Sequence, residues 1–267
     1  MIGAVVYQLR AESAARVPLF HGRWLHGLFF KIMEEYSAEL SAYIHEALQI
    51  KPFTVSLLKW RQGEEAGGYR AVRKGETMSW RVTALREDVL QAALHVRVGD
   101  VLQAGFLPLR VEEVKADGTH DSGVVDELEL VGAALSAGHI EELRLRFLSP
   151  VAFRRDDKDY PMPDPVLIFS SLADKWQQAA MPVAMDRAWI RDAAAKALLS
   201  EWHGGSRRVY FGGDRGTLAF SGRFGYDVTA LNEEEQHAIL LLAQFATFSG
   251  VGRLTGQGFG ETRIVYK

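Results

Sequence analysis

The chain has 267 residues, of which 48% are hydrophobic and none is cysteine. This length can bury one large core or two of ordinary size, and we start from two domains. The lack of cysteine excludes disulfides, thiolate metal sites and a cysteine nucleophile, and agrees with a reducing compartment. No run of about 18 apolar residues is present, and the N-terminus runs from a strand-like pattern into charge, so we expect a soluble, cytoplasmic protein.

The formal net charge is −3, which argues against a protein that coats nucleic acid indiscriminately. The distribution is more informative than the sum. Residues 1–143 hold 15 basic and 20 acidic side chains, whereas residues 144–267 hold 16 basic and 14 acidic ones. Twelve of those 16 are arginine, whose planar guanidinium suits phosphate. The second half is therefore the better candidate for phosphate contacts.

Residues 1–138 show strand and helix patterns in the order β-α-β-β-α-β. Apolar residues three or four apart, such as Leu25, Leu28 and Ile32, predict amphipathic helices. Helices are expected at 21–35, 37–48 and 86–98. Extended segments are expected at 1–10, 52–60, 69–72, 78–85 and 106–114. This order is that of the ferredoxin-like fold.

The second half repeats this cycle after a polar stretch at 115–123 and an ambiguous segment that ends at Gly138. We expect strands at 140–148, 207–211, 218–226 and 261–266, and helices at 164–178 and 187–203. A last helix begins at Asn232, with Glu235 three residues on in a capping-box arrangement, and stops at Ser249–Gly250. The sequence thus predicts an α+β protein of two tandem ferredoxin-like domains, 1–138 and 139–267.

A glycine-rich loop follows the last predicted helix. Five glycines occur in eleven residues: Gly250, Gly252, Gly256, Gly258 and Gly260. Glycines that admit positive φ let backbone N–H groups approach a phosphate or ribose, although a tight helix-to-strand connection would explain them too. A dinucleotide fingerprint fails because the motif follows a helix and Thr255 breaks the spacing, and no Walker A loop is present.

The loop sequence GVGRLTGQGFG resembles the C-terminal signature of the RAMP superfamily, and specifically of the CRISPR-associated endoribonucleases that cut repeat RNA. Three other segments agree with this resemblance in order: WLHGLFFKIM, AYIHEALQIKPFTVSLL and LSPVAFRRDDKDYPMPDPVLIFSSLADKW. The glycine loop is shared with non-catalytic relatives. The histidine followed by Lys-Pro-Phe-Thr is what points to a nuclease.

The resemblance implies cleavage of CRISPR repeat RNA in precursor crRNA without a metal ion. A ribose 2′-hydroxyl would attack the adjacent phosphate and leave a 2′,3′-cyclic phosphate and a 5′-hydroxyl. Such a reaction needs a proton acceptor, a proton donor and positive charge near the phosphorane. Histidine suits proton transfer because its unperturbed pKa is about 6.5, and lysine or arginine supplies the charge.

His45 and Lys51 match the family's histidine and lysine positions. Counting about 100° per residue, His45 points away from the apolar face of its predicted helix. Lys51 lies six residues later, where the chain turns into the PFTVS strand. We expect both side chains to reach one scissile phosphate, and the pattern does not tell which proton His45 transfers.

The sequence departs from the family at Phe30, where some relatives have a catalytic tyrosine. A phenyl ring cannot transfer a proton, so either Tyr36 or Tyr43 substitutes, His26 one turn earlier contributes, or two groups suffice. His26 is the alternative base. A histidine packed in a domain interface would be the structural alternative for it.

For RNA contacts we predict the five loop glycines and five arginines: Arg253, Arg154, Arg155, Arg207 and Arg208. Arg253 ranks first, because Asp156 and Asp157 next to Arg154 and Arg155 favour a surface salt bridge there. Phosphate contacts would set affinity, while exposed or stem-loop bases would carry the sequence information. The remaining histidines show no metal-ligand spacing, so we expect neither a metal nor a cofactor.

Two other classes of protein remain open at this point. One is a non-catalytic RNA-binding subunit of a CRISPR effector, and the other is a structural protein without an RNA role. The expected partner is CRISPR repeat RNA, with a homodimer and further effector subunits left open and no membrane contact expected.

Overall fold

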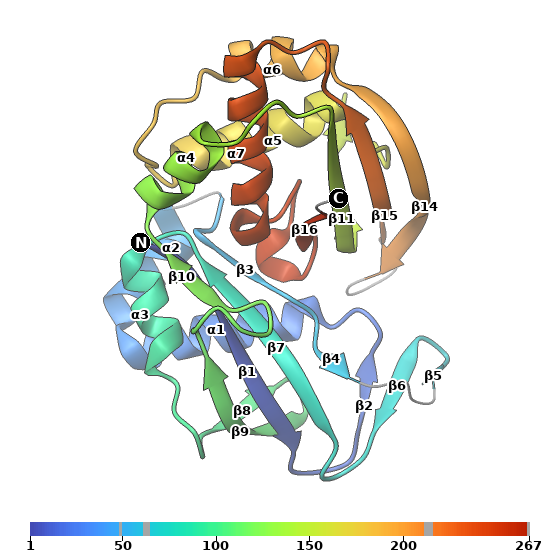
Figure 1. Cartoon of the computed structure of the whole chain (residues 1–267). Helices are drawn as coiled ribbons and strands as arrows, with labels where there is room; N and C mark the ends of the chain where they lie inside the picture. Colours follow the sequence, from blue (N-terminus) through green and yellow to red (C-terminus); the bar gives the residue numbers. More distant parts are fainter. Residues whose placement is uncertain (48–49, 61–64, 211–215, 266–267) are drawn as a thin grey trace. The chain divides into compact units, whose positions relative to one another are not determined.

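The computed structural model describes residues 1–47, 50–60, 65–210 and 216–265. The chain splits into two compact units, drawn in Figure 1. The first unit comprises Met1–Val124 with Gly256–Gly258, and the second comprises Val125–Thr255 with Phe259–Lys267. Each unit is an α+β fold built on its own antiparallel sheet.

The main sheet of the first unit has the order β3-β7-β1-β9-β8, with β4 and β10 attached to β7 and β1. Its strands are β1 (Ile2–Ala11), β3 (Phe53–Val55), β4 (Lys59–Trp60), β7 (Thr77–Ala84), β8 (Val101–Ala104), β9 (Leu107–Lys115) and β10 (Gly123–Val125). Its helices are α1 (Gly22–Tyr36), α2 (Ala38–Ala47) and α3 (Glu87–His95). A small second sheet joins β2 (Ala15–Pro18), β6 (Tyr69–Val72) and β5 (Glu65–Ala66).

The four strands of the predicted ferredoxin-like cycle are β1, β3, β7 and β9, numbered here in chain order. They lie in the order 2-3-1-4 and every neighbouring pair is antiparallel. Helix α1 follows the first strand and α3 follows the third, as the sequence predicts.

The apolar residues of α1 lie three or four positions apart, so their side chains form one row that enters the core. A second row of side chains on the helix stays outside the core. Leu25, Leu28, Phe29 and Ile32 are buried, together with Met33.

The start of α1 is fixed by His21, which lies just before it and is buried. Its Nδ1 lies 2.9 Å from the carbonyl oxygen of Pro18, and its Nε2 accepts the N–H of Leu58 at 2.9 Å. Burial lowers the pKa of His21 to about 4, so its ring is neutral.

The second unit repeats the strand order of the first. Its sheet runs β14-β15-β11-β16, which is again 2-3-1-4 in chain order with antiparallel neighbours. The strands are β11 (Glu142–Val151), β14 (Leu198–Tyr210), β15 (Gly216–Asp227) and β16 (Thr262–Val265). The helices are α4 (Glu127–Leu135), α5 (Pro165–Gln178), α6 (Arg187–Lys196) and α7 (Glu233–Ser249). A two-stranded hairpin joins β12 (Arg154–Arg155) and β13 (Lys158–Asp159), and a 3₁₀ turn spans Thr255–Gln257. The predicted α+β fold class is confirmed.

Helix α7 begins as the sequence predicts. The Asn232 side chain accepts the N–H of Glu235, and the Glu235 carboxylate accepts the N–H of Asn232, which completes the capping box. The helix ends at Ser249, where Gly250 takes a φ of 61°.

The helix predicted at 187–203 is wrong beyond Lys196. Residues 198–203 belong to β14, which pairs with β15 along its whole length. The spacing of Leu198, Leu199 and Trp202 resembles a helical face, yet all three are exposed and mark no core. The predicted strand at 207–211 is the end of this same strand, with Phe211 outside the described residues, as are Leu48 and Tyr266 at two other predicted ends.

The compact units divide between Val124 and Val125, whereas the sequence places the boundary near residue 138. The segment in question contains α4, whose side chains Val131 and Ala134 are buried and which packs against α7 of the second unit. Residues 125–138 therefore group with the second half.

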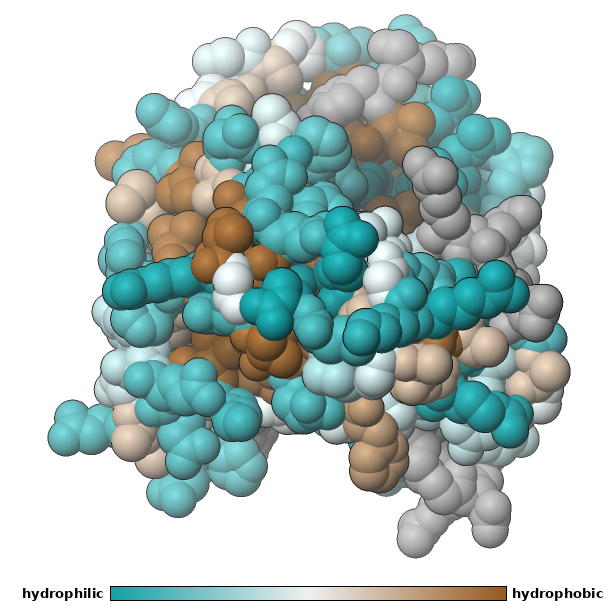
Figure 2. All heavy atoms as spheres, turned by 90° about the horizontal axis from the view of Figure 1, so that it is seen from below, coloured by the Kyte–Doolittle hydropathy of each residue, from teal (hydrophilic) through white to brown (hydrophobic). Residues whose placement is uncertain are grey.

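None of the helices within the described residues is long and apolar enough to cross a membrane. The face seen in Figure 2 mixes hydrophilic areas with smaller hydrophobic ones. Large exposed apolar side chains do occur, and Phe106 on the β8–β9 turn is the most exposed of them, at 84%.

Candidate active site

Two histidines and two phenylalanines form a cluster on α1, α2 and β3. The Phe30 ring lies between the histidines, with centroid distances of 4.9 Å to His26 and 5.3 Å to His45. Phe53 closes the cluster at 5.5 Å from Phe30 and 5.8 Å from His26. His26 and Phe30 share a face of α1 because they are four residues apart, and α2 packs against α1. The three elements thus bring two imidazoles to either side of one phenyl ring.

The ring of His26 is oriented by a backbone carbonyl. Its Nδ1 lies 2.7 Å from the oxygen of Gly256, which can only accept, so Nδ1 carries the proton and Nε2 carries a lone pair. Burial lowers the pKa of His26, and the positive charges of Lys51, His45 and Arg23 lower it further, against the opposing effect of the hydrogen bond to Gly256. The ring is therefore neutral near pH 7 and can accept a proton at Nε2.

Lys51 caps the C-terminal end of the helix that carries His45. Its Nζ donates to the carbonyl oxygens of Ile44 at 2.7 Å and His45 at 2.9 Å. Such a position is favourable for a cation because helix C-termini carry partial negative charge. Burial lowers the pKa of Lys51. The side chain of His45 is exposed, while that of Ile44 next to it is fully buried.

The two candidate tyrosines have other neighbours. The ring of Tyr36 lies 5.5 Å from that of His95, and the ring of Tyr43 lies 5.4 Å from the guanidinium carbon of Arg86. The structure therefore brings His26, and not Tyr36 or Tyr43, into the cluster around Phe30.

Three parts of this site were missed by the sequence reasoning. Arg23 lies one turn before His26 on α1 and acts on its pKa, and only the i, i+3 spacing could have signalled it. The sequence places Phe53 in an extended segment and signals no role for it in the site. The carbonyl of Gly256 is 230 residues away from His26 in the sequence and gives no local signal.

The glycine-rich loop uses the conformations that glycine permits. Gly250, Gly252, Gly258 and Gly260 have φ between 61° and 85°, whereas Gly256 does not have a positive φ. Leu254 is also left-handed, at 61°.

The segment 256–258 packs closely against the start of α1. A Cβ atom at Gly22 would lie 1.8 Å from the carbonyl oxygen of Gln257, so only glycine fits there.

The predicted RNA-binding arginines are all exposed on the second unit. The N–H of Arg253 donates to the carbonyl of Ala152 at 2.9 Å, which places the loop next to the strand that carries Arg154 and Arg155. The β12–β13 hairpin is in turn joined to β15, because the carboxylate of Asp159 accepts the N–H of Leu218 at 2.9 Å.

Leu218 pairs with Arg208 on β14. These contacts connect the three arginine-bearing segments in one region of the second unit.

For Arg154 and Arg155, the structure shows other contacts than the surface salt bridge that the neighbouring aspartates suggest. Arg154 donates to the backbone oxygen of Asp157 at 3.1 Å, and Arg155 lies over the ring of Tyr160 at 5.6 Å. Arg208 donates to the backbone oxygen of Gly216 at 3.0 Å. Because carbonyl oxygens are neutral, these hydrogen bonds do not neutralise the positive charges of Arg154 and Arg208, which favours an anionic partner.

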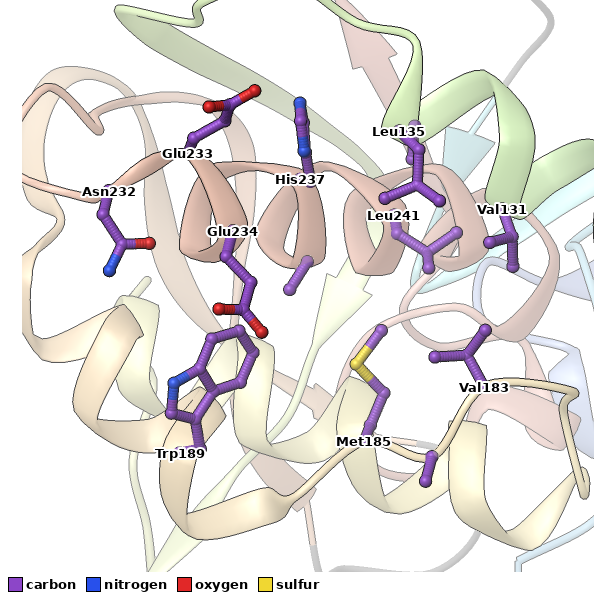
Figure 3. Close-up of a pocket in the computed structure, with 13 residues that line it drawn as sticks. Val131, Leu135, Val183, Met185, Trp189, Asn232, Glu233, Glu234, His237 and Leu241 are labelled. Carbon is purple, nitrogen blue, oxygen red and sulfur yellow. The ribbon is translucent and has the colours of Figure 1, made fainter.

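A cavity of about 580 Å³ lies in the second unit between α4, α6 and α7. Figure 3 shows Val131, Leu135 and Leu241 on one side of it and Val183 and Met185 on the other, with acidic side chains at one end. The acidic residues are Glu233 and Glu234, and no lysine or arginine lines the cavity. A phosphate would be repelled here, so this cavity is not the nucleic-acid site.

Other histidines have structural partners. His21 is hydrogen-bonded on both ring nitrogens, and His237 Nε2 lies 3.1 Å from the carbonyl oxygen of Ala137. Among the residues that the structure describes, no group of three or more His, Asp or Glu is arranged to hold a metal ion.

Comparisons with known proteins agree on one family. The model of the CRISPR Cas6 N-terminal domain matches residues 1–98, and that of CRISPR-associated endoribonuclease Cas6 matches residues 145–262. The CRISPR-associated endoribonuclease Cas6 of Mycobacterium tuberculosis is 24% identical over 244 residues, which cover 91% of this chain and 71% of that protein.

Solved structures give the same result over nearly the whole chain. A Cas6 product complex has a TM-score of 0.79 and 29% identity, and covers 99% of both chains. Thermus thermophilus Cas6 has a TM-score of 0.73 and 28% identity, and covers 99% of this chain and 98% of that one. A Cas6 substrate mimic complex has a TM-score of 0.72 and 25% identity, and covers 99% of both chains. The chain therefore belongs to the Cas6 family of CRISPR-associated endoribonucleases.

Proposed function

We propose that the protein processes precursor crRNA by cutting CRISPR repeat RNA without a metal ion, through attack of a ribose 2′-hydroxyl on the adjacent phosphate. The observation that carries this proposal is the cluster around Phe30, where His26 and His45 lie on either side of one ring and Lys51 holds the end of the helix that carries His45. These residues would supply two proton-transfer groups and one cation. Similar solved structures are a Cas6 product complex and a Cas6 substrate mimic complex, which supports repeat RNA as the ligand of this chain.

His26 is proposed as the general base. Its Nε2 takes the proton of the 2′-hydroxyl, and the oxygen forms a bond to phosphorus. Its lowered pKa and the hydrogen bond from Nδ1 to Gly256 keep this lone pair available at neutral pH.

His45 is proposed as the general acid. It protonates the 5′-oxygen as the bond from phosphorus to that oxygen breaks, which leaves a 2′,3′-cyclic phosphate and a 5′-hydroxyl. Its exposure makes it accessible to an RNA ligand. Lys51, held at the end of the same helix, stabilises the negative charge that develops on the phosphorane.

RNA affinity is assigned to the second unit. Arg253, Arg154, Arg155, Arg207 and Arg208 would contact phosphates, and the glycine-rich loop would approach the RNA backbone through its N–H groups. Phosphate contacts position the RNA, while its sequence is read elsewhere, from unpaired or loop bases.

The test is incubation with the host's repeat RNA in EDTA, followed by end-group analysis of the fragments. We expect a cyclic phosphate and a 5′-hydroxyl at one position. His45→Ala should bind the RNA as tightly as the unchanged protein and cut it about 10²-fold more slowly or worse. His95→Ala is the matched control, since His95 is also exposed in the first unit but lies outside the cluster.

Two results would contradict the proposal. Cleavage that requires a divalent ion would exclude the metal-independent reaction. Tight binding with no cleavage by the unchanged protein would assign the chain to RNA binding alone.

A further inference from the structure

A lysine is buried beneath the glycine-rich loop of the second unit. Lys175, on α5, is only 4% exposed. Its Nζ donates to the carbonyl oxygens of Ser249 at 3.0 Å and Gly250 at 2.8 Å, and to the hydroxyl of Thr255 at 3.4 Å. One ammonium group therefore contacts both ends of the segment 249–255.

This environment is unusual for a buried lysine. Buried ammonium groups are normally paired with a carboxylate, because desolvation of an unpaired charge is costly. The three hydrogen-bond acceptors of Lys175 are neutral oxygens, and burial lowers its pKa to about 7. A methionine or leucine could fill the same volume without that cost, so packing alone does not explain a lysine here.

The contacts of Lys175 complete hydrogen bonds that the backbone leaves open. The last carbonyls of a helix have no partner within it, and Ser249 and Gly250 stand at the end of α7. Thr255 lies on the returning side of the loop, where its methyl group would be 2.9 Å from a Cβ atom at Gly250. The segment folds back on itself around the ammonium group.

Arg253 lies between the two anchored ends. Its N–H is fixed to Ala152 on one side, and Lys175 fixes the residues before and after it. The position of this exposed guanidinium therefore depends on a side chain that no ligand can touch directly.

We propose that Lys175 is a positioning residue for RNA binding, which holds residues 249–255 so that Arg253 and the loop backbone meet a phosphodiester. This inference rests on the proposed function for its RNA-binding consequence, although the effect on the loop itself can be measured without RNA.

The first experiment is hydrogen exchange on the RNA-free protein with Lys175→Met. Amides of Gly250, Val251 and Arg253 are hydrogen-bonded in the structure, so they should exchange slowly in the unchanged protein. The variant should speed exchange at 250–255 at least tenfold while exchange within 236–246 of α7 stays unchanged.

The second experiment measures the affinity for repeat RNA that carries a 2′-deoxyribose at the scissile position. Loss of hydrogen bonds to a charged group predicts a Kd about tenfold higher for Lys175→Met. Lys196→Met is the matched control, because Lys196 pairs with Glu235 at 2.5 Å at the opposite end of α7. It should lower stability and leave the Kd unchanged. If Lys175 only stabilised the fold, Lys175→Met would behave like Lys196→Met and leave the Kd unchanged.

A further variant covers the case in which Lys175→Met fails to fold. Thr255→Val removes one acceptor of the ammonium group and keeps the side chain's shape, so it should change loop exchange and Kd in the same direction by a smaller factor. Unchanged exchange at 250–255 in folded variants would overturn the proposal. If the unchanged protein does not bind repeat RNA, the proposed function fails, while the exchange result still decides the role of Lys175.

Discussion

Replacing Lys51 by methionine tests whether this lysine only caps a helix or also stabilises charge during catalysis. The change keeps the aliphatic length of the side chain and removes the hydrogen bonds to the carbonyl oxygens of Ile44 and His45. A partly exposed cation at a helix end contributes about 1–2 kcal/mol through such contacts. A domain with roughly 5–15 kcal/mol of stability stays folded after this loss.

The catalytic effect should be larger than the structural one. Removing one group that stabilises charge in a transition state costs about 3–4 kcal/mol, which is a rate loss of roughly 10²–10³. The assay is single-turnover cleavage at saturating repeat RNA, with denaturant unfolding of the same samples. Lys31→Met is the control, because Lys31 is an exposed lysine on α1 that pairs with Glu35 on the same helix.

The outcome of the paired measurements is decisive. We expect a small loss of stability with a rate at least 100-fold lower for Lys51→Met and no change of rate for Lys31→Met. A rate within threefold of the unchanged protein, together with the expected loss of stability, would reduce Lys51 to a helix cap and refute the catalytic assignment.

Three further predictions concern the pH profile, the start of α1 and RNA affinity. Because the pKa of His26 is held below its usual value of about 6.5, the rising limb of the pH profile of kcat/KM, which reports the general base, should have its inflection below that value, and His26→Gln should abolish this limb; a rising limb with its inflection above pH 7 would contradict the assignment. Gly22→Ala should lower the unfolding temperature by several degrees, because the added Cβ atom would collide with the carbonyl oxygen of Gln257. Gly27→Ala should not lower it, since a Cβ atom at Gly27 would have no atom within 4 Å. Equal effects of the two variants in thermal unfolding would be inconsistent with this packing. Arg253→Ala should weaken RNA binding and lower the slope of log K against log salt by about 1, and an unchanged slope would mean that Arg253 touches no phosphate.

Local chemistry made much of the fold predictable. The capping box at Asn232 and Glu235 involves residues three apart, so the sequence shows both partners, and the amphipathic spacing of α1 shows its core face. Strand β14 was not predictable in the same way, because Trp202 and its neighbours are exposed in a strand at the sheet edge and their apolar pattern reflects no burial.

In the candidate site too, contacts between residues close in the sequence were predictable and contacts between distant residues were not. His45 and Lys51 are six residues apart, so the sequence itself indicates that the two residues lie close together. The contacts of His26 with Gly256 and of Lys175 with Thr255 join residues 230 and 80 positions apart. Periodicity carries no information over such separations, so the tautomer of His26 and the anchoring of the loop became apparent only from the fold.

The neutral ring of His21 makes the scaffold sensitive to acid. With a pKa of about 4 when folded and about 6.5 when unfolded, His21 binds its proton more readily in the unfolded chain, so stability declines as the pH falls from 6.5 to 4, by roughly 3 kcal/mol in all. Protonation would set an N–H against the N–H of Leu58 and loosen the entry into α1. If His26 is the general base, the lower pH limit of the enzyme is governed by two imidazoles five residues apart, His26 through proton transfer and His21 through the stability of the helix that carries it.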